Sequence, residues 1–439
     1  LNNVPVFTST GEGMLFNFID SFEELTELSF NRVPFSDGLE MDANYRFVAK
    51  VEKDDSDIVL YEDNYAILVK DSSKYLGLDE IDNLIIGVYE GDAERTKLFL
   101  GDFEFVVVDS YDDLVLEEDY LENSEEAAAD EETTNTFNAI VVPKLMMLDE
   151  IMLTNYNIAY DMSDMKLYYV LELAGNEVLN SIITKHYNMW SVDNYQRKFN
   201  ENFNEMYFSK YRINEKEQTD FRSRRYEYGY YERIPYDFLI DNEMAGIHVE
   251  FLKDFSLKTG VEFKFISFNS REELVAGLEN NDIDLMMTRS SSELGDDIFK
   301  TVPIYDSEFV VISQFAKNTV INSIASLTNE RVVIGDNQLL EEKLTQMAIP
   351  FKKIDITKKR DRNLRDNVIV LDKLSFQFYR EKYFKNYKID HVFETENNTR
   401  FLLKDNAENK VFNNYFNFYL TFINNQELVN EGFLKSYQG

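Results

Sequence analysis

Apolar and polar positions in the second half of the chain follow the spacing of strands and helices in turn. Residues 225–231 form an aromatic-rich, strand-favouring run, and Pro235 ends it because proline fixes its own φ and restricts the residue before it. Residues 247–255 carry apolar side chains at largely helical spacing, and Gly260 is a suitable left-handed cap. Residues 261–266 then alternate as in a half-buried strand.

A second helix and a buried strand continue this order. Ser270 and Glu273 have the spacing of a capping box, in which the serine side chain accepts from the first turn and the glutamate reaches back. The helix is expected to end near Asn280, and residues 284–287 to form the next buried strand. An order of strand, helix, strand, helix and strand implies parallel pairing with right-handed crossovers. The predicted fold class is α/β.

The first half repeats this order in a weaker form. Residues 19–25 have helical spacing, residues 28–33 are expected to form a strand, and residues 57–60 and 65–70 to form two more. The recurrence of one order of elements along the chain suggests two copies of one domain.

A polar stretch just after Tyr211 marks the expected junction between the copies. We therefore predict a first, divergent domain over residues 1–211 and a second domain over residues 212–439. Within the second domain, lobe one is expected over about 220–312 and 408–439, and lobe two over about 315–405.

Length and composition agree with two packed domains. A chain of 439 residues exceeds the usual size of one core, and 44% hydrophobic residues are enough to exclude global disorder. The formal charge of −36 argues against nucleic acid or an anionic membrane surface as a partner. The acidic stretch at residues 110–134 is expected to be partly a mobile loop, because like charges repel.

The cysteine and histidine content further limits the chemistry that is open to the chain. The chain has no cysteine, which excludes disulfides and thiolate chemistry. His186, His248 and His391 are far apart in sequence, so we expect packing or surface residues, with no metal site and no cofactor. No stretch approaches the roughly 20 apolar residues of a membrane span. Because the chain starts on leucine without a signal pattern, we expect a fragment whose signal or anchor lies outside it.

The second half resembles a known family. The resemblance rests on the Pro-aromatic loop at 235–236, on Asn-Glu-x-x-Gly-Ile-x-Val-x-Phe-Leu at 242–252, on Asp-Ile-Asp-Leu-Met-Met at 282–287 and on Val-Pro-Ile-Tyr at 302–305. These residues are similar to the type 2 periplasmic binding fold of the family 3 extracellular solute-binding proteins. The resemblance implies two tandem bilobal (Venus-flytrap) domains, each lobe a mostly parallel sheet flanked by helices.

The resemblance also implies a ligand site. In that family an aromatic residue of the first loop stacks on the ligand, a Thr-x-x-Arg motif holds its carboxylate, and an aspartate after a lobe-two strand holds its ammonium group. Carried over by position, Tyr236, with Tyr231 nearby, takes the aromatic role, and Asp372 takes the role of the ammonium-binding aspartate.

The carboxylate-binding arginine departs from the pattern. Its expected position falls near Asp296, and an aspartate cannot form the bidentate pair that guanidinium forms with a carboxylate. Arg289, in one loop with Thr288 and Ser291, is the candidate substitute, and a surface ion pair is the alternative for it. In the first copy, Pro143 stands where Asp372 stands in the second, so the first domain is not expected to bind amino acids.

Several functions are compatible with these residues. The favoured one is the extracytoplasmic, membrane-anchored sensory region of a bacterial signalling protein, which binds a small solute, with an amino-acid-like molecule as one candidate. A substrate-binding lipoprotein of an ABC-type importer and a ligand-free scaffold or adhesin stay open, as does a homodimer. An enzyme on the same fold is disfavoured, because the sequence offers neither paired catalytic carboxylates nor a nucleophile with a neighbouring base.

Overall fold

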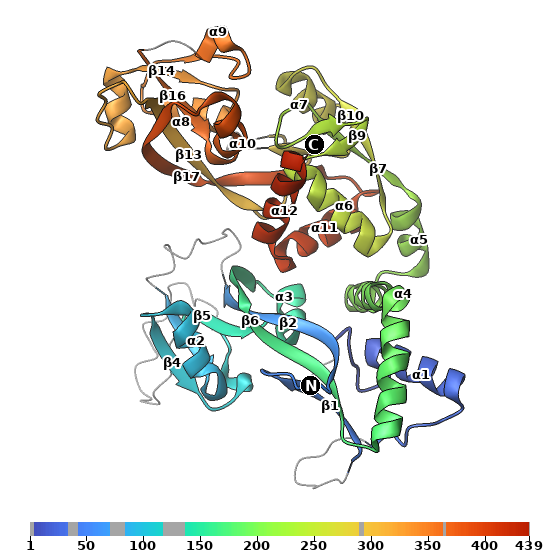
Figure 1. Cartoon of the computed structure of the whole chain (residues 1–439). Helices are drawn as coiled ribbons and strands as arrows, with labels where there is room; N and C mark the ends of the chain where they lie inside the picture. Colours follow the sequence, from blue (N-terminus) through green and yellow to red (C-terminus); the bar gives the residue numbers. More distant parts are fainter. Residues whose placement is uncertain are drawn as a thin grey trace, which may run out of the picture. The chain divides into compact units, whose positions relative to one another are not determined.

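The computed structural model describes residues 4–33, 43–70, 84–116, 137–288, 294–362 and 366–438. It divides into two compact units, and the division falls between Gln218 and Thr219 (Figure 1). Most of the predicted acidic loop lies outside the described residues. Each unit is described below by itself.

The first unit is built on one six-stranded sheet with the order β1-β6-β2-β5-β3-β4. β3 is parallel to β4 and to β5, and the other neighbours are antiparallel. The strands are β1 (Tyr45–Lys50), β2 (Ile58–Val69), β3 (Ile85–Tyr89), β4 (Glu104–Val108), β5 (Ala139–Pro143) and β6 (Asn157–Leu173). Residues 57–60 and 65–70, predicted as two strands, thus belong mainly to the single strand β2.

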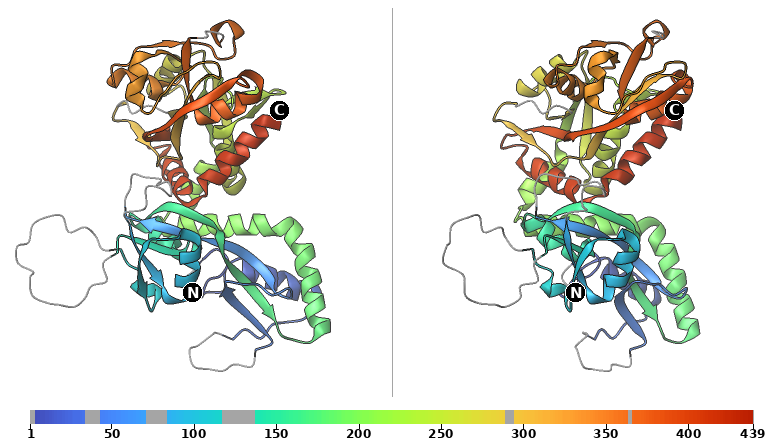
Figure 2. Two further views of the ribbon diagram at one scale, coloured as in Figure 1. Left: turned by 60° about the vertical axis from the view of Figure 1, so that its left-hand side comes forward. Right: turned by 90° about the vertical axis from the view of Figure 1, so that its left-hand side faces the viewer.

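Helices flank this sheet. They are α1 (Met14–Thr26), α2 (Ala93–Leu100), α3 (Leu148–Leu153) and α4 (Glu177–Lys210), with 3-10 turns at Glu90–Asp92, Tyr111–Asp113 and Leu145–Met147. α4 stays helical over 34 residues, although Figure 2 shows it bending between two straight halves. The predicted polar junction is itself largely helical, because α5 (Glu215–Ser223) spans the division between the units.

The prediction of a strand at residues 28–33 is wrong. These residues form no regular secondary structure. α1 ends in a left-handed residue, Glu27, at φ 58°, and the Phe30 amide then donates to the Glu23 carboxylate at 2.9 Å. The Phe30 ring packs on Phe22 of the preceding helix. Side-chain packing on α1 has therefore replaced the strand pairing that local propensity suggested.

The second unit contains a nine-stranded sheet and a short hairpin, β8–β9. The sheet order is β10-β7-β11-β17-β13-β16-β14-β15, with β12 also paired to β17. The strands are β7 (Arg225–Tyr230), β8 (Phe238–Ile240), β9 (Glu243–Ala245), β10 (Glu262–Ser267), β11 (Leu285–Thr288), β12 (Ile298–Lys300), β13 (Tyr305–Gln314), β14 (Arg331–Ile334), β15 (Phe351–Lys353), β16 (Asn367–Asp372) and β17 (Tyr387–Lys404).

The helices of the second unit confirm the predicted order from residue 225 onward. They are α6 (Ile247–Thr259), α7 (Arg271–Glu279), α8 (Gln338–Gln346), α9 (Lys359–Arg362), α10 (Lys373–Tyr383), α11 (Lys410–Phe422) and α12 (Asn425–Gln438), with a 3-10 segment at Ile324–Asn329. Gly260 caps α6 at φ 80°, and the Ser270 hydroxyl accepts from the Glu273 amide at 3.2 Å. β7 is parallel to both β10 and β11.

Two lobes share this sheet. Lobe one holds β7–β12 with α6, α7, α11 and α12, and one of its apolar clusters packs α7 against β11 and β17. Lobe two holds β14–β16 with α8, α9 and α10, and has an apolar cluster on each face of its sheet. β13 and β17 connect the lobes (Figure 1). Such a double connection allows the lobes to move as rigid bodies.

The lobe-two sheet recurs in the first unit. The strand order β6-β2-β5-β3-β4 matches β17-β13-β16-β14-β15, with the same sequence of antiparallel and parallel pairs. In both units a helix connects the two parallel edge strands, α2 in the first and α8 in the second. The first unit therefore repeats the lobe-two sheet, while the strand order of its described residues holds no counterpart of the parallel strands β10, β7 and β11 of lobe one.

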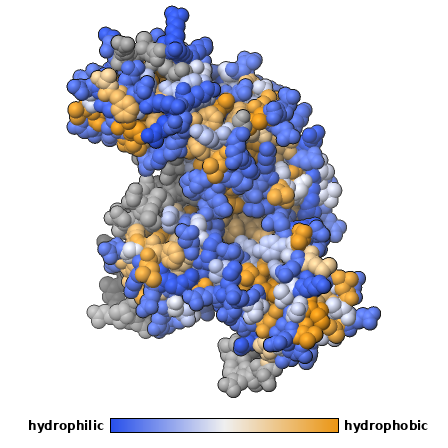
Figure 3. All heavy atoms as spheres, viewed as in Figure 1, coloured by the Kyte–Doolittle hydropathy of each residue, from blue (hydrophilic) through white to orange (hydrophobic). Residues whose placement is uncertain are grey.

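Hydrophilic residues cover most of the face visible in Figure 3, with small hydrophobic patches between them. This agrees with a chain in which 29% of the residues are charged. Among the described residues, no helix combines the length and the apolar character needed to cross a membrane.

Candidate ligand-binding pocket in the second unit

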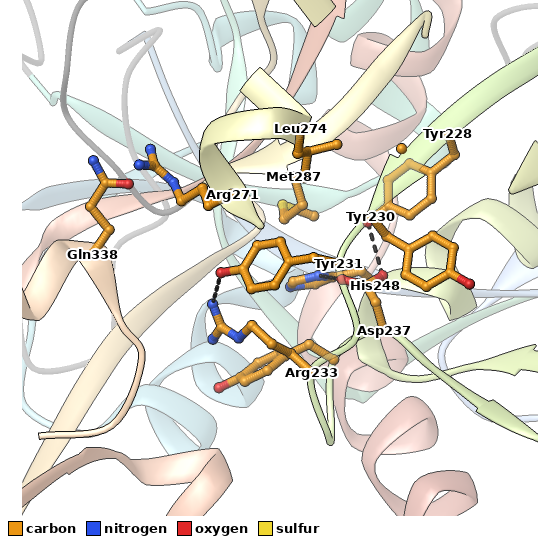
Figure 4. Close-up of a pocket in the computed structure, with 12 residues that line it drawn as sticks. Tyr228, Tyr230, Tyr231, Arg233, Asp237, His248, Arg271, Leu274, Met287 and Gln338 are labelled. Carbon is orange, nitrogen blue, oxygen red and sulfur yellow. Dashed lines mark hydrogen bonds and ion pairs between the residues drawn. The ribbon is translucent and has the colours of Figure 1, made fainter. Parts of the chain in front are cut away.

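A pocket lies where the parallel strands of lobe one end. The carboxyl ends of parallel strands leave a crevice in open α/β sheets, and ligands commonly bind there. In the arrangement of the lobes seen here, the pocket has room for only about 30 Å³. Its lining residues are Tyr228, Gly229, Tyr230, Tyr231, Arg233, Tyr236, Asp237, His248, Arg271, Leu274, Met287 and Gln338 (Figure 4).

Asp237 is held by a buried hydrogen-bond chain at the base of this pocket. The Tyr228 hydroxyl donates to its Oδ1 at 2.9 Å, and His248 Nδ1 lies 2.8 Å from its Oδ2. Because a carboxylate only accepts, Nδ1 donates to Asp237. The other ring nitrogen of His248, Nε2, lies 2.8 Å from the Tyr305 hydroxyl. Both Asp237 oxygens and both histidine nitrogens are therefore engaged by the protein itself.

Arg233 is fixed by aromatic neighbours. Its Nη1 donates to the Tyr231 hydroxyl at 2.9 Å (Figure 4). Its guanidinium carbon lies 5.6 Å from the ring centroid of Tyr231 and 5.1 Å from that of Tyr236, within cation–π range. The turn that places it is closed by a 2.8 Å bond from the Tyr236 amide to the Arg233 carbonyl.

Arg271 is a different kind of cation. It is the first residue of α7 and lines both this pocket and an adjoining, wider cleft of about 640 Å³, as do Tyr231 and Gln338. Its guanidinium makes no hydrogen bond or ion pair of 4 Å or less with any residue that the structure describes. Burial lowers the pKa of this guanidinium, and the surrounding negative groups, among them Glu342, act in the opposite direction. A partly desolvated positive charge thus faces the pocket without a close counter-ion in the described parts of the chain.

The structure separates the six predicted site residues. Tyr231 and Tyr236 line the pocket. Thr288 ends β11, where it is buried and pairs with Arg400, and it is not among the lining residues. Arg289 and Ser291 lie outside the described residues. The sixth, Asp372, is considered next.

Asp372 also lies off the pocket lining. It is the N-cap of α10, where its Oδ2 accepts from the Ser375 amide at 3.0 Å. The same oxygen accepts a hydrogen bond from the Tyr236 hydroxyl. The carboxylate predicted to hold a ligand ammonium is therefore engaged by two donors of the protein.

Sequence reasoning missed the charged groups that do line the pocket. Arg271 lies inside the capping box expected between Ser270 and Glu273 and has no predicted role beyond it, and His248 is expected only as a packing or surface residue. The signal for Arg271 was its position, because it starts a helix directly after a parallel strand and so lies at the ligand-binding edge of the sheet. His248 and Asp237 form a pair because the loop before α6 brings them together. No spacing in the sequence predicts this pair.

The loop before α1 in the first unit repeats the loop before α6. In each unit, the first two helix amides donate to the carbonyls of a proline and of the residue after it. The bonds are Met14 to Pro5 at 3.1 Å, Leu15 to Val6 at 3.0 Å, Ile247 to Pro235 at 3.0 Å and His248 to Tyr236 at 3.2 Å. Val6 and Leu15 therefore occupy the positions of Tyr236 and His248.

At the positions that match Tyr236, Asp237 and His248, the first unit thus carries apolar side chains. Val6 and Leu15 carry apolar side chains, and Phe7 follows Val6 as Asp237 follows Tyr236. At the other lobe, Pro143 ends β5 opposite Tyr65, just as Asp372 ends β16 opposite Phe309. The backbone of this loop and the lobe-two sheet are retained in the first unit, while the hydrogen-bonding side chains at these positions are not.

Comparisons with known proteins agree with this architecture. No protein-family model matches the chain, and no curated protein matches it. A solved structure described as "VC protein" is similar over 95% of this chain and 97% of that chain, with 12% identity and a TM-score of 0.51. The periplasmic domain of BvgS from B. pertussis is similar over 90% of this chain and 76% of that chain, with 13% identity and a TM-score of 0.43.

The glutamate-bound ligand-binding core of GluR0 is similar to about half of the chain. It covers 48% of this chain and 97% of that chain, with 12% identity and a TM-score of 0.40. At such identities a likeness concerns the fold alone. The similarity over nearly the whole length of "VC protein", together with the lobe-two sheet repeated in the first unit, defines the class: two tandem α/β units, of which the second is bilobal with two connecting strands.

Proposed function

We propose that the chain is the extracytoplasmic ligand-sensing region of a bacterial membrane signalling protein, and that it binds a small solute between the lobes of its second unit. One observation carries this proposal. Arg271 of lobe one and Gln338 of lobe two line the same pocket, so a solute bound there touches both lobes and favours their closed arrangement. Membrane attachment is proposed through a segment outside this chain.

The first unit, which has apolar residues at the matching positions of the pocket loop, favours a sensing function over simple delivery of a solute. A carrier needs only a unit that binds, whereas the first unit keeps the backbone of this loop and the lobe-two sheet without the polar residues of the pocket loop. A unit of that kind fits a role in passing on a change of state. The ligand then shifts a two-state equilibrium by its differential affinity for the closed form. Binding without catalysis fits the engaged histidine, because both of its ring nitrogens are already bonded.

Hydrogen exchange on the whole chain tests this function. A library of small solutes is first screened for those that raise the melting temperature, since binding to the native state alone stabilises it. Amide exchange is then compared with and without such a solute. Sensing predicts slower exchange at α7 and α8 and, in addition, altered exchange in α4 of the first unit. Protection confined to the second unit would favour a solute carrier, and the absence of any stabilising solute would contradict ligand binding altogether.

A further inference from the structure

The helix α4 of the first unit has apolar side chains on two faces. Its inner face packs on the unit, where Ile183 and Trp190 are buried and the Trp190 ring lies 5.6 Å from the Phe18 ring of α1. On the same face, the Tyr187 hydroxyl donates to the Val59 carbonyl of β2 at 2.6 Å. A helix at the surface of a protein needs only one apolar stripe to be held there. The inner face is therefore sufficient to attach α4 to its unit.

The outer face of α4 is also apolar, and it is exposed. Its apolar residues have exposed fractions between 42% and 81%, and they are Ile182, Met189, Val178 and Val192. Together with Lys185, they follow one another at spacings of four, three, four and three residues. This is the heptad spacing at which two helices pack along each other. In Figure 2, the half of α4 that follows β6 runs along the outer edge of the first unit. We call these five positions the outer stripe.

Two charged side chains at the outer stripe have no partner in the described parts of the chain. Neither Lys185 nor Asp193 forms a side-chain hydrogen bond or an ion pair of 4 Å or less with a described residue. Arg197, one turn after Asp193, is paired with Glu201 at 3.1 Å. Lys185 and Asp193 are eight residues apart, four before and four after Met189. They do not pair within the helix, because only residues three or four apart are neighbours on its surface.

A second copy of the chain supplies both missing partners at once. In an interface with two-fold symmetry, residue i contacts residue j of the other copy, and residue j contacts residue i. When two α4 helices pack antiparallel about an axis near Met189, each Lys185 lies beside the Asp193 of the other copy. Ile182 and Val192 flank that axis and pack across it. The charges of the outer stripe are therefore complementary to the same stripe on a second copy.

We propose that the outer stripe is a self-association surface, through which two copies of the chain form an antiparallel, two-fold symmetric dimer. The dimer depends neither on the pocket of the second unit nor on a bound solute, so it goes beyond the proposed function. The stripe extends over about 21 Å of helix, at 1.5 Å per residue. An interface of this length is small, and we expect dissociation constants in the micromolar range.

Sedimentation equilibrium of the whole chain tests self-association over about 1 to 200 μM. The mass should rise with concentration from 51.7 kDa, the mass of one chain, towards twice that value. Met189→Asp places a charge at the proposed axis and should keep the mass at that of one chain. Leu257→Asp is the matched control, because Leu257 is 71% exposed on a helix of the second unit. The control should associate as the unaltered chain does.

Exchanged charges test the reciprocal pairs. Lys185→Asp brings like charges together at both sites of the dimer, as does Asp193→Lys, so each variant alone should associate about tenfold more weakly. In an equimolar mixture of the two variants, the altered position of one copy faces the altered position of the other, and the two unaltered residues face each other. Opposite charges then meet at both sites. The mixture should therefore associate about as strongly as the unaltered chain.

Several outcomes would overturn the proposal. A mass of one chain at every concentration would do so, as would association that survives Met189→Asp, because a different surface would then be responsible. A mixture no stronger than either single variant would exclude the reciprocal pairs. Binding to phosphatidylcholine vesicles that Met189→Asp abolishes, without self-association, would assign the outer stripe to a lipid surface instead. Melting temperatures establish that each variant is folded. Solute binding in the second unit is tested separately, so the proposed function stands under any of these results.

Discussion

The Tyr236 hydroxyl donates a hydrogen bond to the Asp372 carboxylate, 136 positions away in sequence. Tyr236 belongs to the loop before β8 in lobe one, and Asp372 ends β16 in lobe two. The bond therefore joins the two lobes through side chains of the protein. Both residues were predicted to contact a ligand, and they contact each other. The bond thus helps to hold the lobes in the arrangement seen in this structure.

Tyr236→Phe should loosen the contact between the lobes. The ring and its packing against His248 and Arg233 are kept, while the hydrogen bond to Asp372 is lost at a cost of about 1 kcal/mol or somewhat more. Faster amide exchange is expected at the first turn of α10 and at the pocket loop. Tyr437→Phe is the control, because Tyr437 is an exposed tyrosine on α12. Equal exchange in Tyr236→Phe and the unaltered chain would mean that the bond does not hold the lobes together.

Substitutions of Asp372 should separate its two contacts. Asp372→Ala removes the N-cap of α10 together with the bond to Tyr236, and the lost cap alone costs about 1 kcal/mol. Asp372→Asn keeps a good capping side chain and replaces a charged acceptor by a neutral one. We expect the alanine variant to lower the melting temperature in the absence of any solute, and the asparagine variant to lower it less. If both variants melt like the unaltered chain, the carboxylate has no structural role.

The sequence predicted the elements from residue 225 onward because their signals are local. Gly260 and Ser270 cap their helices by hydrogen bonds to residues within four positions. Helix caps and hydrophobic periodicity can therefore be recognised without knowledge of the rest of the fold. The strand expected at 28–33 failed for a related reason. Strand propensity around Phe30 is local, but a strand needs a partner, and the Glu23 carboxylate takes the Phe30 amide instead.

Residues of the pocket were harder to predict because the fold brings them together from distant positions. His248 and Tyr305 are 57 positions apart and share a hydrogen bond. Arg271 and Gln338 line the same pocket only because two helices of different lobes begin at one crevice. Tyr231 and Tyr236, the aromatic residues that the resemblance indicates, line the pocket because they lie in the segment that follows β7. Whether they bind a solute stays a prediction.

Gly246→Ala should destabilise the pocket loop strongly. Gly246 has φ 124°, and a Cβ atom there would lie 2.0 Å from the Tyr236 carbonyl oxygen. Both the backbone conformation and the backbone contact oppose a side chain, so a loss of several kcal/mol is expected, above the roughly 1 kcal/mol of a poor φ alone. Gly260→Ala is the matched control, with φ 80° and open space around the added carbon. Thermal unfolding of both variants measures the difference, and equal losses would refute the close approach.

The equivalent substitution in the first unit should have a smaller effect. Gly13 has φ 116°, and its added Cβ would lie 2.7 Å from the Val6 carbonyl oxygen. The contact is less severe than the one at Gly246. The only tryptophan of the chain, Trp190, is buried in the first unit, so its fluorescence follows the unfolding of that unit. We expect Gly13→Ala to lower the temperature of the unfolding transition that Trp190 fluorescence reports. Gly246→Ala should leave that temperature largely unchanged.

Asp63 should make the first unit less stable as the pH rises. It lies on β2, almost fully buried, and burial raises the pKa of its carboxyl to about 7, against the opposing effects of the Leu145 amide and of Lys144. In the unfolded chain the carboxyl has its ordinary pKa near 4. Its protonated form is therefore favoured by folding. That contribution is complete below about pH 4 and is lost as the pH rises towards 7.

Asp63→Asn isolates this contribution, because the amide resembles the protonated acid and does not titrate. Each unit of pKa difference corresponds to about 1.4 kcal/mol. The unaltered chain should therefore lose up to a few kcal/mol of unfolding free energy relative to Asp63→Asn between about pH 4 and pH 7. Urea unfolding followed by Trp190 fluorescence at several pH values measures it. Asp102→Asn, at an exposed position, is the control and should show the pH dependence of the unaltered chain. Parallel pH profiles for Asp63→Asn and the unaltered chain would show that Asp63 titrates alike in the folded and unfolded states.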